Sequence, residues 1–318
     1  MAHARLTAQR SQFVGAPAFR ILIGIFGAVW LFNAVWQAEA WLVAPGAKAN
    51  LLRAFSHPAT KVPAGLRPLL LAIVHGVERI GPTPIAALIV AISVLLGLAL
   101  LTRTALAATA CIGLAYSLFY WLVLNGLGFP YAHGQTDPGV LIAYAITFLF
   151  VLAAHSSLGR AQSAQVDNSA ALWRYARLAF GLLWLFDAVL KWLPAFLFHF
   201  TSQITSVIPG QPHLVAVWLG FVANVTGLIG PVTVAILVAI AETVIAISLL
   251  TGRALKIMLP FSVLYSLLVW VTAEAFGGPY TSAGTGVRGN VLGNVIIYLL
   301  PLFFLWAREL MPPSQPVV

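Results

Sequence analysis

Three ionisable side chains lie inside long apolar stretches of the sequence, where they are candidates for chemistry. Asp187 and Lys191 stand four residues apart in one stretch, and Glu242 lies in another. Residues at i and i+4 share a helix face, so Asp187 and Lys191 can pair, whereas Glu242 has no charged partner at that spacing. In hydrocarbon each such group costs at least about 2.5–3.5 kcal/mol, so it needs a partner or a watery cavity. A proton-carrying carboxyl and a structural ion pair between helices are both open interpretations.

The composition indicates that lipid surrounds these stretches. Of 318 residues, 61% are hydrophobic and only 8% are charged, and the mean hydropathy is +0.95. These proportions lie far outside those of soluble domains. The net charge of +9 does not indicate a nucleic-acid partner, because most basic residues lie at span ends that fall on one side of a membrane. By the positive-inside rule that side is cytoplasmic, so we expect a multi-pass protein of the cell membrane with both termini inside.

Eight apolar runs are long enough to cross a bilayer, which takes roughly 20 helical residues. We expect spans near residues 18–42, 82–101, 104–125, 138–156, 173–194, 231–250, 254–276 and 290–309. Two shorter apolar stretches, 66–80 and 213–229, carry polar residues and precede the second span of each half. We expect them to be amphipathic or re-entrant helices on the outer face. The predicted fold is an all-α integral membrane protein with eight transmembrane helices.

The two halves of the sequence are copies of one unit. The segment WLFNAVWQ from Trp30 matches WLFDAVLK from Trp184 at an offset of 154 residues. A second block matches at an offset of 149 residues, including Gly81-Pro82 with Gly230-Pro231, Tyr116 with Tyr265 and Trp121 with Trp270. An even number of spans per unit gives both copies the same orientation, as parallel repeats. We place the first four-helix repeat at 1–157, a cytoplasmic linker at 158–172 and the second repeat at 173–318.

The matched residues also resemble a known family. The second half, with AETVIAISLLTGRA from Ala241, then Trp270, Glu274 and FGGPYTSAGTG from Phe276, is similar to the DoxX/DoxD membrane proteins. The first half carries a fainter copy in GFPYAHGQTDPG from Gly128. DoxD is the small subunit of thiosulfate:quinone oxidoreductase, so the resemblance implies a four-helix unit and a quinone-linked redox role. It covers most of the chain through short motifs.

The halves differ at the residues that carry the resemblance. Glu242 matches the family's glutamate at the start of its second span, whereas the first half has Ser93 there. Conversely, Asp137 matches the aspartate of the turn before the last span, whereas the second half reads GVRG at 286–289. Each half keeps what the other has lost. This favours one composite site, although drift between duplicated halves explains the pattern almost as well.

The predicted site combines the buried charges with the resemblance. We predict catalytic roles for Glu242, Asp187 and Lys191, and quinone contacts for Tyr116, Tyr265, Trp270 and Asp137. Glu39 and Glu274 lie near span ends, where we expect them to be solvated, and tryptophans such as Trp184 are assigned to the membrane interface. No metal site is expected, because the histidines lack the spacing that aims two imidazoles at one ion, and Cys111 is the single cysteine.

The resemblance and the buried charges together predict the membrane subunit of a quinone-linked oxidoreductase. In this prediction the electrons come from thiosulfate or another reduced sulfur compound, through a second redox subunit. Two alternatives remain open: a transporter whose substrate path runs between the two repeats, and a non-catalytic scaffold subunit of a membrane complex. Membrane lipid is expected as a partner in every case.

Overall fold

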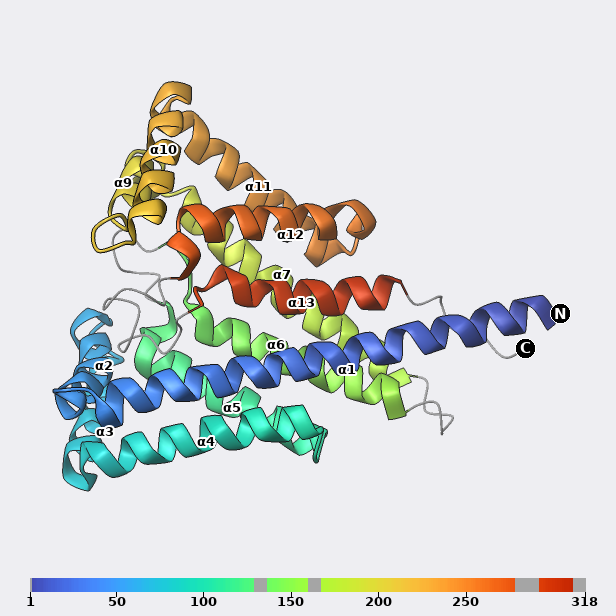
Figure 1. Ribbon diagram of the computed structural model, residues 1–318, viewed down its shortest axis with the longest axis horizontal. Coiled ribbons are helices and arrows are strands. Elements are labelled where there is room, and N and C mark those ends of the chain that lie inside the picture. The colour runs from blue at the N-terminus through green and yellow to red at the C-terminus, as the bar shows by residue number, and fades with distance from the viewer. Residues whose placement is uncertain (1, 129–135, 160–166, 278–291, 311–318) are drawn as a thin grey trace.

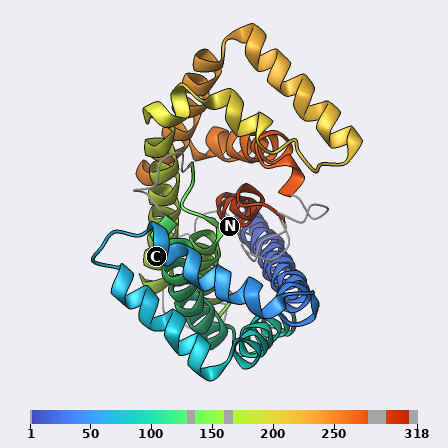
Figure 2. The same cartoon turned by 90° about the vertical axis from the view of Figure 1, so that its left-hand side faces the viewer.

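The computed structural model describes residues 2–128, 136–159, 167–277 and 292–310, and these form helices and turns without a strand. The long helices lie side by side along the longest axis, with the start of α1 and the end of α13 at one end of the bundle (Figure 1). Shorter helices gather at the opposite end: α2 (Ala47–Lys61), α3 (Arg67–Ile80), α9 (Phe200–Thr205) and α10 (His213–Ile229). Viewed from that end, α2 and α3 lie over one side of the bundle and α9 and α10 over the other (Figure 2).

Within the described residues, six helical stretches are long and apolar enough to cross a membrane. They are Pro17–Val43, formed by α1 (Ala2–Ala38) and the π-helix after it, α4 (Pro82–Thr102), α5 (Leu106–Asn125) with the turn after it, most of α6 (Val140–Gly159), α11 (Pro231–Thr251) and α12 (Leu255–Thr272). The prediction of a multi-pass helical membrane protein is confirmed by these six helices.

The other two predicted spans are also helices, but neither meets the requirement for a span by itself. α7 (Asp167–Lys191) is 25 residues long and contains Arg174, Arg177, Asp187 and Lys191. α13 (Val295–Glu309) has only 15 residues, fewer than the roughly 20 that a span needs. Both helices pack against α6 in the centre of the bundle.

Glycine-proline pairs mark where the second long helix of each half begins. Gly81 and Gly230 have φ angles of 104° and 101°, and each precedes a proline at the first position of α4 or α11. Glycine adopts positive φ without a steric penalty, and proline suits the first turn of a helix because its missing N–H is not needed there. The helices therefore begin at residues 82 and 231, where the sequence analysis expected the spans to begin.

Short helices, rather than loops, connect the first two long helices of each half. The structure has α3 and α10 where the sequence predicted outer-face helices at 66–80 and 213–229. It also has α2 and the small helices α8 (Pro194–Leu197) and α9, which the sequence analysis did not predict. A signal for α2 was present, because Leu51, Ala54 and Phe55 recur at helical spacing and are buried on one face.

The two halves pack their helices in the same way. α1 packs along α4 and α7 along α11, while α5 packs on α6 and α12 on α13. Glycines permit the close approach of α1 to α4 and of α7 to α11. A Cβ on Gly27 would lie 2.8 Å from the Gly97 oxygen, and one on Gly181 would lie 2.9 Å from the Leu250 side chain. Small residues at such crossings let helix backbones approach closely in membranes.

Aromatic side chains join the halves in one core. Phe150 of α6 stacks on Phe304 of α13, with ring centroids 6.0 Å apart, and meets Phe180 of α7 edge-on at 6.2 Å. All three side chains are fully buried. The last long helix of each half therefore lies at the junction, with α7 beside it.

We expect Gly27→Ala to destabilise the protein by about 1–3 kcal/mol, because the added methyl meets the backbone of Gly97 and forces α4 to move. Gly24→Ala in the same helix is the matched control, since nothing lies within 4 Å of its Cβ position. Alanine also favours helix over glycine by up to about 1 kcal/mol. Thermal unfolding in detergent compares the two variants. Equal melting temperatures would contradict the close approach of α1 to α4.

Candidate functional site

A cavity of about 570 Å³ lies between helices of the second half. Its walls come from α7, α11, α12 and α13, and from α9 and α10 at the end of the bundle. This volume falls within the range of about 300–1,000 Å³ that is usual for small-molecule sites. Five acidic or basic residues line it: Asp137, Asp187, Lys191, Glu242 and Glu274. Within the described part of the chain, Thr136 and Asp137 are the lining residues that come from the first half.

Lys191 and Glu242 form an ion pair across two helices of this cavity. The Lys191 Nζ lies 3.5 Å from Glu242 Oε2, and the Tyr265 hydroxyl donates a hydrogen bond to Glu242 Oε1 at 2.7 Å. All three residues are buried. Glu242 has no charged partner at helical spacing in its own helix, as the sequence indicated, and its ion-pair partner comes from α7 instead.

Asp187 takes a different partner from the one predicted. The Tyr298 hydroxyl donates to Asp187 Oδ2 at 2.9 Å, while Lys191 pairs with Glu242 and donates to the backbone oxygen of Thr136. The Lys191 ammonium also lies 5.3 Å from the ring centroid of Phe196. Pairing between Asp187 and Lys191 along one helix face is thus replaced by contacts to other elements, although the two charges remain close in one cluster.

The first half has a neutral version of the same arrangement. Asn33 donates to the Tyr144 hydroxyl at 2.6 Å, and Ser93 donates to Gln37 Oε1 at 2.8 Å. These four residues stand where the second half has Asp187, Tyr298, Glu242 and Lys191. The two halves therefore keep the same pairs of positions in contact but carry charges only in the second half.

Asp137 links the two halves at the rim of the cavity. Its Oδ1 accepts from the backbone N–H of Gly139 at 2.7 Å and from Asn294 Nδ2 at 2.9 Å. The first contact precedes α6 and the second precedes α13, so one carboxylate lies at the beginning of both helices. A residue of the first half thereby joins a cavity that the second half otherwise builds.

We expected Glu274 to be solvated, but it lies at the start of α13. Its Oε1 accepts from the backbone N–H groups of Asn294 at 2.8 Å and Val295 at 3.1 Å. Burial raises the pKa of Glu274 to about 8, and the negative charge of Asp137 acts in the same direction, while the two backbone donors oppose the shift. Glu39, by contrast, is exposed as predicted.

Two predicted quinone contacts lie outside the cavity lining. The Tyr116 hydroxyl donates to the Ile89 oxygen at 3.4 Å in the first half. Trp270 Nε1 donates to the Leu292 oxygen at 2.7 Å, as Trp121 Nε1 does to the Pro138 oxygen at 2.8 Å. The matched tryptophans hold the chain before α13 and before α6, which is a structural role.

The sequence prediction missed Trp184, Tyr298 and Gln211, which line the cavity. Trp184 is buried, at 1% exposure, and packs against the rings of Tyr265 and Tyr298 at 5.9 and 5.5 Å, so it does not belong to the interfacial belt. A signal for Tyr298 existed, because Tyr144 precedes it by the repeat offset of 154 residues. Nothing in the sequence indicated Gln211.

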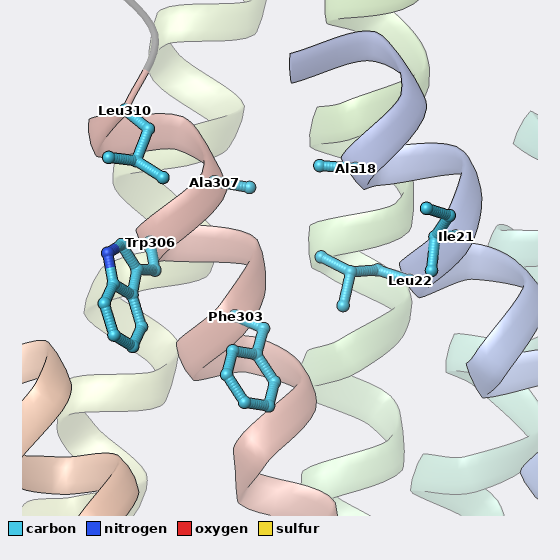
Figure 3. A pocket seen from close by; sticks show the side chains of 7 residues that line it. All are labelled: Ala18, Ile21, Leu22, Phe303, Trp306, Ala307 and Leu310. Carbon is cyan, nitrogen blue, oxygen red and sulfur yellow. The ribbon is translucent and has the colours of Figure 1, made fainter. Parts of the chain in front are cut away.

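A second, smaller cavity of about 300 Å³ lies between α1 and the C-terminal end of α13. Figure 3 shows its lining side chains, which are Ala18, Ile21, Leu22, Phe303, Trp306, Ala307 and Leu310. None of them is ionisable, so this groove offers no acid, base or ion pair. Among the described residues, no group of three His, Cys, Asp or Glu side chains is arranged to hold a metal ion.

No family model matches this sequence, and neither a curated protein nor a solved structure matches it. The resemblance to the DoxX/DoxD proteins accordingly rests on the short motifs alone. Function is argued below from the cavity and the side chains that line it.

We expect Lys191→Gln and Glu242→Ser to be coupled. Either change alone leaves a buried charge without its ion-pair partner, which costs about 3–5 kcal/mol in soluble cores. Together they recreate the Gln37–Ser93 hydrogen bond of the first half, so the double variant should lose less stability than the two single losses combined. Thermal unfolding of the four proteins measures the coupling, and additive losses would contradict it. The same cycle with Asp187→Asn in place of Glu242→Ser should give a smaller coupling.

Stability should fall with rising pH in a manner that depends on Glu274. Its pKa rises from 4.5 to about 8 on folding, so its contribution to stability is complete below pH 4.5 and is lost as the pH rises through 8. Glu274→Gln keeps the acceptor for the two N–H groups but cannot titrate, so it should flatten the decline between about pH 5 and pH 8. Glu39→Gln, at an exposed carboxyl, is the control. Parallel pH profiles for parent and Glu274→Gln would refute the assignment.

Proposed function

We propose that this chain is the quinone-binding membrane subunit of an oxidoreductase and that its cavity receives the quinone head group. One observation carries the proposal: an ammonium, a carboxyl and a phenol, from Lys191, Glu242 and Tyr265, meet on the wall of a cavity within an apolar helical bundle. A quinone head group needs an apolar cleft, hydrogen-bond donors for its carbonyl oxygens and a source of protons. The lining residues supply each of these.

The proposed roles follow from the contacts of each group. Reduction of a quinone consumes two electrons and two protons. The ammonium of Lys191 is a donor that can hold a carbonyl oxygen and stabilise negative charge on it. The hydroxyl of Tyr265 can do the same when Glu242 carries a proton and no longer accepts from the phenol. Glu242 touches both donors, so a proton that it carries lies within one hydrogen bond of the same oxygen. Solvent protons reach this carboxyl past Asp137 and Glu274, which line the same cavity.

The electrons are proposed to come from a reduced sulfur compound such as thiosulfate, through a partner redox protein. This part rests on the resemblance of the second half to DoxD. In this proposal the partner oxidises the sulfur compound and this chain binds and protonates the quinone. The cavity lining suits the second task, because it provides acid, base and hydrogen-bond groups.

The proposed membrane arrangement has eight spans, with both termini in the cytoplasm of the cell. α7 and α13 are included because they pack against α6, and because Asp187 and Lys191 of α7 are both buried within the bundle. Intramembrane charges of this kind face a bundle interior or a cavity. In this orientation α2, α3, α9 and α10 lie on the outer face, at the end of the bundle where the cavity is.

The alternatives are less well supported by the same geometry. A substrate path between the two repeats would be lined by both, whereas among the described residues the first half contributes Thr136 and Asp137 and the second half contributes the rest of the lining. A scaffold subunit explains the ion pair of Lys191 and Glu242 as a link between helices. It gives no reason for a cavity of about 570 Å³ lined by five acidic or basic residues.

We expect Glu242→Gln to slow quinone reduction by about a hundredfold or more per folded protein, because the amide keeps the shape and hydrogen bonding of the carboxyl but carries no proton. The measurement is reduction of a soluble quinone analogue by membranes that contain the protein with its native partners. Thiosulfate, and then sulfide or a thiol, serves as donor, with rates normalised to protein level. Glu39→Gln is the control. An unchanged rate would remove the proton-transfer role, and no donor-dependent reduction by the parent would remove the oxidoreductase proposal.

A further inference from the structure

Two polar atoms on one face of α7 have no hydrogen-bond partner among the described residues. They are Trp184 Nε1 and Asp187 Oδ1. Both residues line the cavity, and their exposed fractions are 1% and 4%. Buried polar atoms are nearly always paired in proteins, so two such atoms at one cavity wall indicate a place for a ligand.

Trp184 and Asp187 stand three residues apart on α7. Residues three apart on a helix are neighbours on its surface. Tyr298 contacts both side chains, since its hydroxyl donates to Asp187 Oδ2 at 2.9 Å and its ring lies 5.5 Å from that of Trp184. The hydroxyl of Tyr298 already serves one carboxylate oxygen, which leaves the other oxygen and the indole N–H for a ligand atom.

One chemical group satisfies both atoms at once. An indole N–H only donates. Asp187 accepts from Tyr298 at one oxygen, and in its ionised form, which this inference assigns to it, its other oxygen also only accepts. A hydroxyl oxygen accepts from Trp184 while its proton is donated to Asp187. A carbonyl oxygen can accept from Trp184 but places a second acceptor against Asp187, which leaves that carboxylate oxygen unpaired.

We propose that Trp184 and Asp187 form the subsite for one oxygen of the quinone head group and that this subsite prefers the hydroquinone. The proposal rests on the proposed function and specifies which form of the ligand the site holds more tightly. A site that binds the reduced form more tightly makes the bound quinone easier to reduce, because binding and reduction are linked equilibria. Asp187 is thereby a ligand-binding residue, rather than the intrahelical partner of Lys191 expected from the sequence.

The first half provides an internal comparison for this subsite. Trp30 Nε1 and Asn33 Oδ1 occupy the matching positions and also have no hydrogen-bond partner among the described residues. Neither residue lines the cavity, and Asn33 is neutral. The unpaired atoms are therefore common to both repeats, whereas the cavity and the carboxylate that give them a ligand-binding use belong to the second half.

Binding of each redox form to the purified full-length protein tests the proposal without reliance on turnover. The probes are decyl-ubiquinone and decyl-ubiquinol, followed by a short-chain naphthoquinone and its reduced form, titrated anaerobically in detergent by calorimetry. We expect the reduced form of the preferred head group to bind about tenfold or more tightly than the oxidised form, as one unsatisfied buried acceptor predicts.

Two variants separate the contributions of the two side chains. Asp187→Asn should abolish or reverse the preference, because the amide N–H can donate to a carbonyl oxygen. Trp184→Phe should weaken the binding of the oxidised and the reduced form by a similar factor and keep the preference for the reduced form, because both forms accept from the indole. Trp30→Phe and Asn33→Ala are the matched controls in the first half and should leave binding unchanged. Elution profile and melting temperature establish that each variant is folded.

The outcomes distinguish this inference from the proposed function. If the parent binds quinones but holds the two redox forms equally, or prefers the oxidised form, the subsite assignment is wrong while the quinone site stands. If neither form of either head group binds, the quinone proposal itself falls and the subsite with it. Should Asp187→Asn fail to fold, a Trp184→Phe variant that binds as tightly as the parent would overturn the assignment.

Discussion

A lysine ammonium buried in an apolar bundle needs partners, and the partners of Lys191 tie this structure together. Its ion pair with Glu242 connects α7 to α11, and its hydrogen bond to the Thr136 oxygen connects α7 to the segment before α6. A single charge thus links elements of both halves around one cavity. Removing any one of these contacts leaves a charge or a carbonyl without compensation in a region where water is scarce.

The matching contacts of the two halves indicate how the helices around this cluster are kept in place. The neutral pairs of the first half, Asn33 with Tyr144 and Gln37 with Ser93, join the same helix positions as the charged pairs of the second half. The frame of helices therefore does not depend on charge. One copy can carry acidic and basic groups for binding or proton transfer while the other supplies packing surface.

The N-termini of α6 and α13 hold two carboxyl groups, of Asp137 and Glu274, that line the cavity. Asp137 accepts hydrogen bonds ahead of both α6 and α13, and Glu274 accepts the first backbone N–H groups of α13. Helix N-termini favour carboxylates because their N–H groups are unpaired and the helix dipole is positive there. The acidic rim is therefore stabilised by backbone, and this leaves Lys191 to compensate the carboxyls deeper in the cavity.

The sequence by itself determined the long helices and their repetition, because apolar runs, glycine-proline starts and matched segments are local signals. It also identified Asp187, Lys191, Glu242, Tyr265 and Asp137, since a buried charge or a repeated polar residue stands out in an apolar chain. The tertiary structure decided which of these side chains meet. Lys191 pairs with a residue 51 positions away rather than four, and Asp137 reaches a cavity of the other half. Such contacts depend on how helices cross, which helical spacing along one segment does not specify.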